Sequence, residues 1–370
     1  MAPQTMKRYV LKHRNGVEGL QLETDAPVPE ITSPHEILIR IKALSLNARD
    51  VQIAQNTYPP PHPIPENLVP VSDASGEVVA VGSGVTRFKV GDRVAPICFQ
   101  GHYNDEDPSW SSVTRGLGGA IHGVAQEYLV SDENDAVAIP SHYTHEQAST
   151  MTIAYSTAWS SLYSHQPKLQ PGQTVLCLGT GGVSLAAAQI ALAAGARVIL
   201  TSSSQSKLDR ADEILQPLVP KSPRDGRPVP NVLQFIDYSK VEQWDQEAKR
   251  LNGGRGVDFV IEISGQGTIA RSIRSVRQGG LVAISGYLTN YSSIPQDIIE
   301  EDIAVNILYA AACVRGVFVC NRSHQEDMVR AIEASGMEPV IDKVFDFDNL
   351  KDAYQHMVDG KHFGKVVVRL

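Results

Sequence analysis

The sequence lacks long apolar runs, closely spaced cysteines and an excess of positive charge. No apolar stretch approaches the roughly 20 residues of a membrane-spanning helix, which argues against a membrane protein. The four cysteines, Cys98, Cys177, Cys313 and Cys320, are scattered and contain no CxxC pair. We therefore expect neither a disulfide framework nor a cysteine-based metal site. The formal net charge of -8 disfavours a nucleic-acid-binding surface.

The start of the chain also lacks the pattern of a secretion signal. Residues 1–12 include charged side chains and no continuous apolar stretch, so we expect no signal peptide. The scattered cysteines suit a reducing compartment, which favours the cytoplasm. The length of 370 residues favours about two domains, and 42% hydrophobic with 20% charged residues is ordinary for a globular protein.

The N-terminal third is predicted to be rich in β-strands. Residues 36–43 alternate polar and apolar side chains, and residues 76–82 and 90–94 are short apolar segments that glycine interrupts. Short strands separated by turns favour an antiparallel barrel or sandwich. Residues 56–65 are rich in proline and cannot form the interior of a helix, and residues 99–119 read as a long loop that suits ligand binding.

The pattern changes from about residue 174 onwards. Continuous apolar runs at 175–178, 197–200, 257–261 and 280–284 are typical of buried parallel strands. An alanine- and leucine-rich segment at 183–194 predicts a helix directly after the first run. Strands that alternate with helices in this way predict an α/β domain with a doubly wound parallel sheet.

A glycine-rich turn joins the first of these strands to its helix. The turn consists of Gly179, Thr180, Gly181, Gly182 and Val183. Gly179 allows the tight turn, Gly181 lets a pyrophosphate approach the backbone, and the start of the helix offers free N–H groups. Ser184 stands where the third glycine of GxGxxG is expected. A turn that merely needs glycine is the alternative, but the strand–turn–helix context favours dinucleotide binding.

The residues after the second strand indicate which dinucleotide binds. An NAD site places an acidic residue there, about 20 residues after the glycine turn, to hold the ribose hydroxyls. This chain has Ser202, Ser203 and Ser204, followed by Lys207, and no acidic residue before Asp209. Hydroxyls and a cation suit a 2′-phosphate, so we expect NADPH. The same serines would also cap the next helix, which is the alternative.

Several segments together resemble one protein family. They are 46–50 (Leu-Asn-Ala-Arg-Asp), 72–78 (Ser-Asp-Ala-Ser-Gly-Glu-Val), 90–94 (Val-Gly-Asp-Arg-Val), 179–184 (Gly-Thr-Gly-Gly-Val-Ser) and 363–367 (Phe-Gly-Lys-Val-Val). In this order they cover nearly the whole chain, which resembles the medium-chain dehydrogenase/reductase superfamily, in its zinc-free quinone oxidoreductase and alcohol dehydrogenase-like branch.

The resemblance implies a division into domains. A Rossmann NADP-binding domain at 157–319 would be inserted into a GroES-like β-barrel catalytic domain made of 1–156 and 320–370. The active site would lie in the cleft between the two domains. Relatives of this branch often pair through the outer Rossmann strand, here near residues 311–319, so the resemblance also implies a homodimer.

The family's metal-binding positions are unusual in this chain. In zinc-dependent relatives they correspond to Asn47, Ser72-Asp73 and about Ile153, where asparagine and serine are poor zinc ligands and isoleucine is none. The four-cysteine structural zinc lobe is absent as well. We interpret three further candidates, His102, His122 and His145, as surface or turn histidines because of their irregular spacing. We therefore expect no metal.

The resemblance also suggests further cofactor-binding residues. Ser204, Lys207 and Tyr238 match positions that hold the 2′-phosphate, and Thr157 matches a threonine beside the nicotinamide, although it would also serve as a helix cap. The other candidates follow later strands or lie near the C-terminus, and they are Gly265, Gly286, Tyr287, Leu288 and Lys365. A solvated strand lysine is the alternative for Lys365.

Reduction without a metal requires hydrogen-bond donors and a proton source near the acceptor. A conjugated C=C or a quinone spreads the new negative charge into an enolate, so we expect such a small carbonyl or quinone substrate. Asn47 and Tyr58 are the candidate catalytic donors, Tyr58 because it resembles the active-site tyrosine of quinone reductases. An ordinary turn residue and a surface aromatic are the respective alternatives.

Two other functions stay open. A metal-free alcohol dehydrogenase or ketoreductase would use the same cofactor on an isolated carbonyl. A non-enzymatic NADPH-binding protein would use the cofactor-binding domain without any acceptor.

Overall fold

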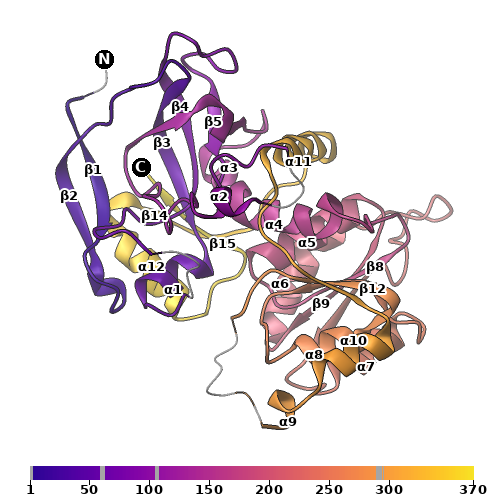
Figure 1. Cartoon of the computed structure of the whole chain (residues 1–370). Coiled ribbons are helices and arrows are strands. Elements are labelled where there is room, and N and C mark those ends of the chain that lie inside the picture. Colours follow the sequence, from indigo (N-terminus) through magenta and orange to yellow (C-terminus); the bar gives the residue numbers. More distant parts are fainter. Residues whose placement is uncertain (1–2, 59–62, 105–107, 289–293, 295) are drawn as a thin grey trace. The chain divides into compact units, whose positions relative to one another are not determined.

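The computed structural model describes residues 3–58, 63–104, 108–288, 294 and 296–370 (Figure 1). The chain divides into two compact units. Unit 1 comprises Met1–Ser156 and Val319–Leu370, and unit 2 comprises Thr157–Phe318. The predicted domain boundaries after residues 156 and 319 lie within one residue of these divisions. Parts of the expected loops at 56–65 and 99–119 fall outside the described residues.

Unit 1 is built mainly from antiparallel strands. They are β1 (Thr5–Leu11), β2 (Leu20–Pro27), β3 (Glu36–Leu46), β4 (Asp73–Val81), β5 (Arg93–Pro96), β6 (Tyr128–Asp132), β7 (Ala136–Ala138), β14 (Ile341–Asp346) and β15 (Lys365–Arg369). β1 pairs with β2, and the larger sheet has the order β14-β15-β3-β4-β5-β7, with β6 also paired to β3. Only β14 and β15 run parallel among the described pairs of this sheet.

Strand β3 organises this sheet because it pairs with three other strands. Most of its residues are buried, with Arg40 the exposed exception, and the stretch from Ala43 to Leu46 is buried throughout. There β4 lies on one side, with Ser45 opposite Asp73, and β15 on the other, with Leu46 opposite Val366. The end of β3 therefore meets the start of β4 and the start of β15 in the interior of unit 1.

Unit 1 also contains helices, most of them short. They are α1 (Ala48–Ala54), α2 (Trp110–Val113), α3 (His145–Ala148), α11 (Arg322–Ser335) and α12 (Leu350–Val358), and α4 (Ser156–Trp159) begins at the last residue of the N-terminal part. α2 lies within the segment expected as a loop, where the Ser109 hydroxyl accepts from the Ser112 N–H and caps the helix. α1 and α12 contact each other, and Tyr354 of α12 is fully buried in the core.

Unit 2 contains the parallel sheet. Its strands are β8 (Thr174–Cys177), β9 (Arg197–Ser202), β10 (Leu233–Asp237), β11 (Val257–Glu262), β12 (Val276–Ile284) and β13 (Cys313–Gly316), in the order β10-β9-β8-β11-β12-β13. All of these strand pairs are parallel. The predicted doubly wound sheet is therefore confirmed, and the chain changes direction across the sheet between β8 and β11.

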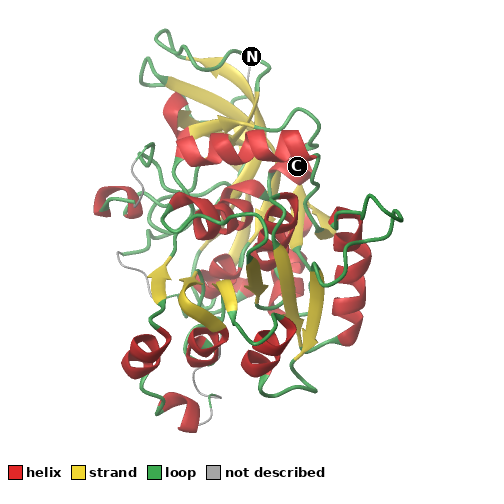
Figure 2. Cartoon of the chain, turned by 90° about the vertical axis from the view of Figure 1, so that its right-hand side faces the viewer, coloured by secondary structure: helices red, strands yellow, loops and turns green. Residues whose placement is uncertain are grey.

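Helices cover both faces of the parallel sheet (Figures 1 and 2). They are α5 (Gly182–Ala193), α6 (Gln205–Leu215), α7 (Trp244–Leu251), α8 (Ile269–Ser275), α9 (Gln296–Ile299) and α10 (Ile303–Ala310). α5 and α6 contact each other, as α8 does with α7 and α10. Every residue of β8 and of β11 is buried, as expected for strands covered on both faces. No helix in the described residues is long and apolar enough to span a bilayer.

Candidate functional site

The predicted cofactor-binding residues of unit 2 gather at one edge of the parallel sheet. β8 ends at Cys177, β9 at Ser202, β10 at Asp237, β11 at Glu262 and β12 at Ile284. Parallel strands place all these carboxyl ends at the same edge, which is where open α/β sheets bind ligands. The predicted residues that directly follow these ends belong to the glycine turn, the serine cluster, the segment around residue 238 and the turns at 265 and 286–288.

The glycine turn has the geometry that a pyrophosphate needs. Gly179 adopts a φ of 75°, which favours glycine, and Gly181 forms the N-cap of α5. A Cβ atom added at Gly181 would meet nothing within 4 Å, so space is open in front of its backbone. The first N–H groups of α5 have no partner within the helix and face an incoming anion with the positive end of the helix dipole.

Ser184 explains why the third glycine is dispensable. Its side chain is fully buried, and its hydroxyl donates to the Leu178 carbonyl at 2.5 Å. The helix therefore packs against the strand as closely as a small residue allows, and the added hydroxyl is paired. The departure from GxGxxG leaves the turn intact.

The end of β9 presents hydroxyl groups. Ser203 is exposed, and the Ser204 hydroxyl lies 2.9 Å from that of Ser206 and accepts from the Lys207 N–H at 3.4 Å. Ser202 is buried, and its hydroxyl accepts from the Ser204 N–H. Ser204 is thus the N-cap of α6, as the capping alternative expected. A helix N-terminus with hydroxyl groups also suits a phosphate, so the two roles are compatible.

Tyr238 lies beside this serine cluster. Its N–H donates to the Ser202 carbonyl, and its side chain is 42% exposed. The preceding residue, Asp237, is a carboxylate near the same edge. Its side chain is bound by the Lys240 ammonium at 2.8 Å and by the Ser239 hydroxyl, and these groups lower the pKa of Asp237. The nearby negative charge is therefore paired with a cation.

A buried carboxylate shapes the turn that contains Gly265. Glu262 accepts from the N–H groups of Ser264 and Gly265 and from the Thr268 hydroxyl, at 2.7, 3.0 and 2.7 Å. Next to it, a Cβ at Gly286 would approach the Ile263 carbonyl oxygen to 2.5 Å, so this close packing requires glycine. Tyr287 and Leu288 follow directly, and Leu288 is 49% exposed.

Thr157 lies within a helical segment. A π-helical turn at Met151–Tyr155, helix α4 and a second π-helical turn at Ser160–Ser164 follow one another without a break. Thr157 is buried, and its carbonyl accepts from the Ser161 hydroxyl. The alternative that Thr157 caps a helix is therefore wrong, because the helical segment begins before it. A role beside the nicotinamide stays a prediction.

Unit 1 contains a buried cluster of polar side chains around the end of β3. The Lys365 ammonium donates to the Leu46 carbonyl at 2.8 Å, to Asn47 Oδ1 at 2.6 Å and to Asp73 Oδ2 at 3.1 Å. The side chains of Lys365 and Asp73 are 4% and 0% exposed. The alternative of a solvated strand lysine is therefore wrong, because β15 starts inside the unit and directs the ammonium to buried acceptors.

Asp73 is the centre of this cluster. Its Oδ2 also accepts from the Ser45 hydroxyl at 3.0 Å and from Asn47 Nδ2 at 2.9 Å, and its Oδ1 accepts from the Ile153 N–H at 2.8 Å. A fully buried carboxylate is stable only when such partners replace water. Asn47, which we interpreted as a donor or an ordinary turn residue, is fixed from both ends of its amide.

A second cluster adjoins the first through neighbouring residues. Arg49 donates to the Ser72 hydroxyl and to the Leu117 carbonyl, each at 2.8 Å. The Arg49 guanidinium lies 5.5 Å from the ring centroid of Tyr58 and hydrogen-bonds its side chain. Tyr58 packs against the hydrophobic core, so the alternative of a loose surface aromatic is wrong.

Asp50 is a buried acid beneath both clusters. Its Oδ2 accepts from the Asn47 N–H at 2.8 Å. Burial raises the pKa of Asp50 to about 6, although Arg49 and the Asn47 N–H act in the opposite direction. Burial also raises the pKa of the Cys98 thiol to about 12, which makes this cysteine a neutral, unreactive side chain.

The positions matched to zinc ligands do meet in unit 1, but their groups do not fit zinc. Asn47 and Asp73 direct their oxygens to the Lys365 ammonium, and Ile153 contributes a backbone N–H. The ammonium already occupies the oxygen lone pairs, and a positive charge there repels a second cation. Zinc prefers thiolate, imidazole and carboxylate ligands, of which only the Asp73 carboxylate is present.

The three candidate histidines lie apart and in different bonding environments. His122 accepts from the Val69 N–H, and the His145 ring lies 2.9 Å from the Ser75 hydroxyl. Burial lowers the pKa of both histidines. His102 is only 2% exposed and its backbone N–H donates to the Phe99 carbonyl, so it is a buried turn histidine and not a surface one. Among the described residues, no cluster of three or more His, Cys, Asp and Glu side chains could hold a metal.

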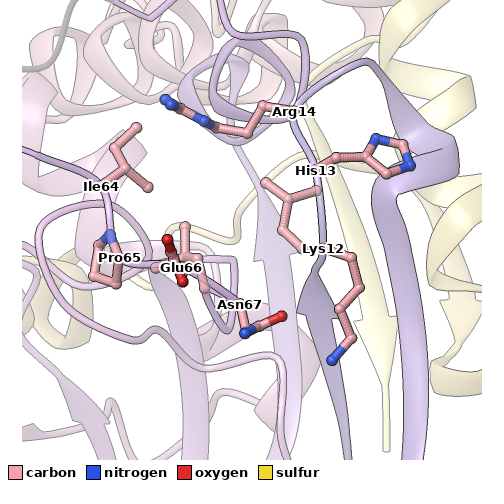
Figure 3. Close-up of a pocket in the computed structure, with 9 residues that line it drawn as sticks. Lys12, His13, Arg14, Ile64, Pro65, Glu66 and Asn67 are labelled. Atoms are coloured by element: carbon pink, nitrogen blue, oxygen red, sulfur yellow. The ribbon is translucent and has the colours of Figure 1, made fainter.

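A separate pocket of about 270 Å³ lies in unit 1 (Figure 3). Residues 11–14 and 64–68 line it, and Arg14 extends toward Ile64 whereas the His13 ring points away from that segment. The cationic Lys12 is already paired with Glu23 at 2.9 Å. None of the predicted site residues lines the pocket, and we assign no role to it.

Sequence reasoning missed several residues that hold the site together. Glu262 ends an apolar strand with a carboxylate, and that pattern could have marked it. Asp73 matches one of the family's zinc-ligand positions, but its burial is not visible in the sequence. Arg49 and Asp50 have no predicted role, since nothing local in the sequence shows which side chains they meet.

Comparison with known proteins identifies the family of this chain. The alcohol dehydrogenase GroES-like domain matches residues 33–141, and the zinc-binding dehydrogenase domain matches residues 182–336. A zinc-type alcohol dehydrogenase-like protein of Schizosaccharomyces pombe is 37% identical, over 98% of this chain and 99% of that protein. The quinone oxidoreductase of Rattus norvegicus is 26% identical over 96% and 95% of the two chains.

Two further relatives extend the comparison. The crotonyl-CoA carboxylase/reductase of Cereibacter sphaeroides is 30% identical, over 78% of this chain and 71% of that protein. A solved structure of an NAD-dependent alcohol dehydrogenase is 29% identical, covers 99% of this chain and all of the other, and has a TM-score of 0.82. The chain is thus an oxidoreductase that belongs to the medium-chain dehydrogenase/reductase superfamily.

Proposed function

We propose that this oxidoreductase uses NADPH, works without zinc, and reduces a conjugated C=C of an enone or enoyl compound, or a quinone. One observation is central to the proposal. An ammonium, that of Lys365, lies among the residues that match the family's metal ligands, and it holds a hydrogen-bonding amide beside it. Chemistry at such a site relies on hydrogen-bond donors.

The choice of NADPH rests on the carboxyl edge of the parallel sheet in unit 2. Hydroxyls of Ser203 and Ser204 and the start of α6 offer hydrogen-bond donors where an NAD site has a carboxylate. Lys207 and Tyr238 complete the proposed 2′-phosphate site. Gly179 to Val183 would hold the pyrophosphate, and Thr157 with the turns at Gly265 and Gly286 would flank the nicotinamide.

One solved relative is described as NAD-dependent, so the choice between NADPH and NADH needs a direct test. A binding measurement provides it. Protein fluorescence titrations should give a lower Kd for NADPH than for NADH. The reverse order would overturn the NADPH assignment and leave the family membership intact.

Zinc independence rests on the donor chemistry of Asn47, Asp73 and Lys365. Elemental analysis of protein purified without added metal should find far less than one zinc per chain. Activity should persist after prolonged dialysis against a chelator. Stoichiometric zinc would contradict the proposal.

Bound NADPH would supply a hydride to the acceptor carbon. The negative charge that develops on the conjugated oxygen then needs a donor, and Asn47 Nδ2 has a second N–H beyond the one that Asp73 accepts. Tyr58, held by Arg49, is the proposed proton source. A delocalised enolate needs less stabilisation than an alkoxide, which favours conjugated acceptors over isolated ketones.

Two relatives support this substrate class, since one is a quinone oxidoreductase and the other a crotonyl-CoA carboxylase/reductase. The test is a single-turnover assay with NADPH and three matched acceptors: an enone, a quinone and the saturated ketone of the same carbon skeleton. NADPH oxidation by the enone or the quinone supports the proposal. Reduction of the ketone alone would favour a metal-free alcohol dehydrogenase or ketoreductase.

The alcohol dehydrogenase alternative has its own support in the names of two relatives. The non-enzymatic alternative makes a different prediction, namely micromolar NADPH binding with no oxidation by any of the three acceptors.

We also propose a homodimer in the cytoplasm. β13 is an edge strand, and Leu308 and Tyr309 of the preceding helix are 73% and 80% exposed. An edge strand with exposed apolar neighbours is suited to pairing with a second copy. Sedimentation of wild-type protein and of Tyr309→Glu should show a dimer for the first and a monomer for the second. Three of the free cysteines are buried, which agrees with a reducing compartment.

A further inference from the structure

Lys365 is held in the interior by the pairing of three strands. It is the first residue of β15, whose next three residues are completely buried. The Val366–Leu46 pairing joins β15 to the end of β3, and the Ser45–Asp73 pairing joins β3 to the start of β4. The lysine side chain is therefore directed to one small volume bounded by the ends of three strands.

All three N–H groups of the ammonium have acceptors. They are the Leu46 carbonyl, Asn47 Oδ1 and Asp73 Oδ2, at 2.8, 2.6 and 3.1 Å. The three N–H groups of an ammonium thus match the three acceptors in number, and the Asp73 carboxylate is the counter-ion.

The same contacts force one orientation of the Asn47 amide. Its Oδ1 accepts from the Lys365 ammonium, and its Nδ2 donates to Asp73 Oδ2 at 2.9 Å. In the flipped orientation, Nδ2 would face the ammonium and Oδ1 would face the carboxylate, and both contacts would be repulsive. The second N–H of Nδ2 forms no hydrogen bond to the described part of the chain, and Asn47 is partly exposed.

We propose that Lys365 is a positioning residue that orients and polarises the Asn47 amide, so that its second N–H becomes a strong donor for the acceptor's oxygen. A cation on the carbonyl oxygen of an amide withdraws electron density and strengthens its N–H donors. Lys365 thus gives the metal-free site part of the positive charge that a metal ion would have supplied. The inference rests on the proposed function, in which Asn47 contacts the substrate.

This role differs from the predicted one, in which Lys365 binds the cofactor directly. A cofactor contact would change NADPH affinity, whereas polarisation of Asn47 changes the rate of reduction at saturating NADPH. The two roles are therefore separable by measuring the Kd for NADPH and kcat in the same variants.

The first experiment compares Lys365→Met, Lys365→Ala and the matched control Arg369→Met, which removes an exposed cation from the same strand. We expect kcat to fall at least tenfold in both Lys365 variants, with the Kd for NADPH within twofold of wild type. Methylammonium should restore part of the activity of Lys365→Ala, where it has room, and none of that of Lys365→Met. Arg369→Met should resemble wild type.

Two results would overturn the inference while the proposed function stands. One is an increased Kd for NADPH with unchanged kcat, which would make Lys365 a cofactor ligand. The other is an active, folded Lys365→Met with unchanged kcat.

A second measurement uses wild-type protein. It tests whether the Asn47 amide is polarised even if the variants do not fold or no acceptor is reduced. Selective 15N-asparagine labelling, with Asn47→Ser for assignment, reports the hydrogen bonding of the Asn47 amide by NMR. We expect its two N–H protons to resonate downfield of those of exposed asparagines. Resonances in the exposed range would overturn the inference, whereas absence of reductase activity in wild type alone would overturn the proposed function.

Discussion

The two units hold their candidate site residues in opposite ways. In unit 1, charged side chains are buried and bonded to one another, with Asp73 accepting four side-chain or backbone donors. In unit 2, the corresponding edge presents glycine backbone, small hydroxyls and the starts of helices, and its buried carboxylate, Glu262, is bonded to N–H groups and hydroxyls and not to another charge. In the first arrangement the buried charges of Asp73 and Lys365 are paired without a ligand, while the second has open N–H groups and space in front of Gly181.

This difference shows which property each unit contributes. A buried ionic network has one low-energy geometry, because every displaced partner leaves a charge without compensation. Such a network suits a rigid set of donors for a reaction. An edge of free backbone N–H groups costs little without its ligand, since water satisfies it, and it suits a cofactor that binds and leaves.

The largest effect is expected from breaking the ionic network of unit 1. Asp73→Ala leaves the buried Lys365 ammonium without its counter-ion, and we expect a loss of about 3–5 kcal/mol in the free energy of unfolding. Urea unfolding followed by circular dichroism measures it. The control is Asp346→Ala, which removes an exposed partner of Arg369 and should cost at most about 1 kcal/mol. Equal losses for the two variants would contradict the contrast between the units.

In unit 2, Gly181→Ala should weaken cofactor binding and leave stability unchanged, the reverse of the effect expected for Asp73→Ala. Its backbone is extended, with a φ of -79°, and an added Cβ meets nothing within 4 Å, so the melting temperature should not change. We expect the Kd for NADPH to rise roughly 100-fold, about 2.7 kcal/mol, because the Cβ keeps the pyrophosphate from the backbone. Gly179→Ala is the comparison. There a φ of 75° predicts a loss of about 1 kcal/mol in stability.

The buried acid of unit 1 should make stability depend on pH. Burial raises the pKa of Asp50 from 3.8 to about 6 in the folded state. The folded state therefore holds this proton when the unfolded state has lost it, and the free energy of unfolding falls as pH rises from 4 to 6. We expect Asp50 to account for about 2 kcal/mol of this fall.

Asp50→Asn tests that expectation, since the amide oxygen still accepts from the Asn47 N–H. The variant should gain stability over wild type as pH rises from 4 through the folded-state pKa of about 6, and keep a constant advantage above about pH 7. Urea midpoints of both proteins at pH 4.5, 6.0 and 7.5 measure the difference. A difference that does not vary with pH would show that Asp50 titrates normally.

The smallest effect is expected at the proposed 2′-phosphate site of unit 2. Lys207→Ala should raise the Kd for NADPH about tenfold, or 1.4 kcal/mol, through loss of one cation near the 2′-phosphate. The Kd for NADH should stay unchanged. Lys168→Ala removes an exposed lysine elsewhere in the unit and serves as the control. A parallel loss of NADH binding would assign Lys207 to the helix and not to the phosphate.

Much of unit 2 was predictable because its signals are local. Continuous apolar runs predicted the strands, and the expected helix at 183–194 is α5 within one residue at each end. Gly179 and Gly181 lie next to the strand and helix that they join. The carboxyl edge then follows from parallel pairing alone, which brings Ser202, Tyr238 and Gly265 to the same side.

The site in unit 1 was less predictable because its contacts are long-range. Lys365 contacts Asn47 and Asp73 across 318 and 292 residues of sequence. No periodicity or motif spacing encodes which buried lysine meets which carboxylate over such distances. The burial of Tyr58 and His102, both interpreted as exposed in at least one alternative, depends on packing in the same way.

The sequence by itself determined the parallel sheet, the glycine turn and the chemistry of the residues at its edge, because strand, turn and helix signals lie within a few residues of each other. It also indicated that good zinc ligands are absent from the positions that match the family's metal site. Only the tertiary structure decided what stands in their place, because the pairing of β3 with β4 and β15 brings Lys365, Asn47 and Asp73 together. A buried charge is stable only where the fold supplies its partner. Here the strand register determines which residue that partner is.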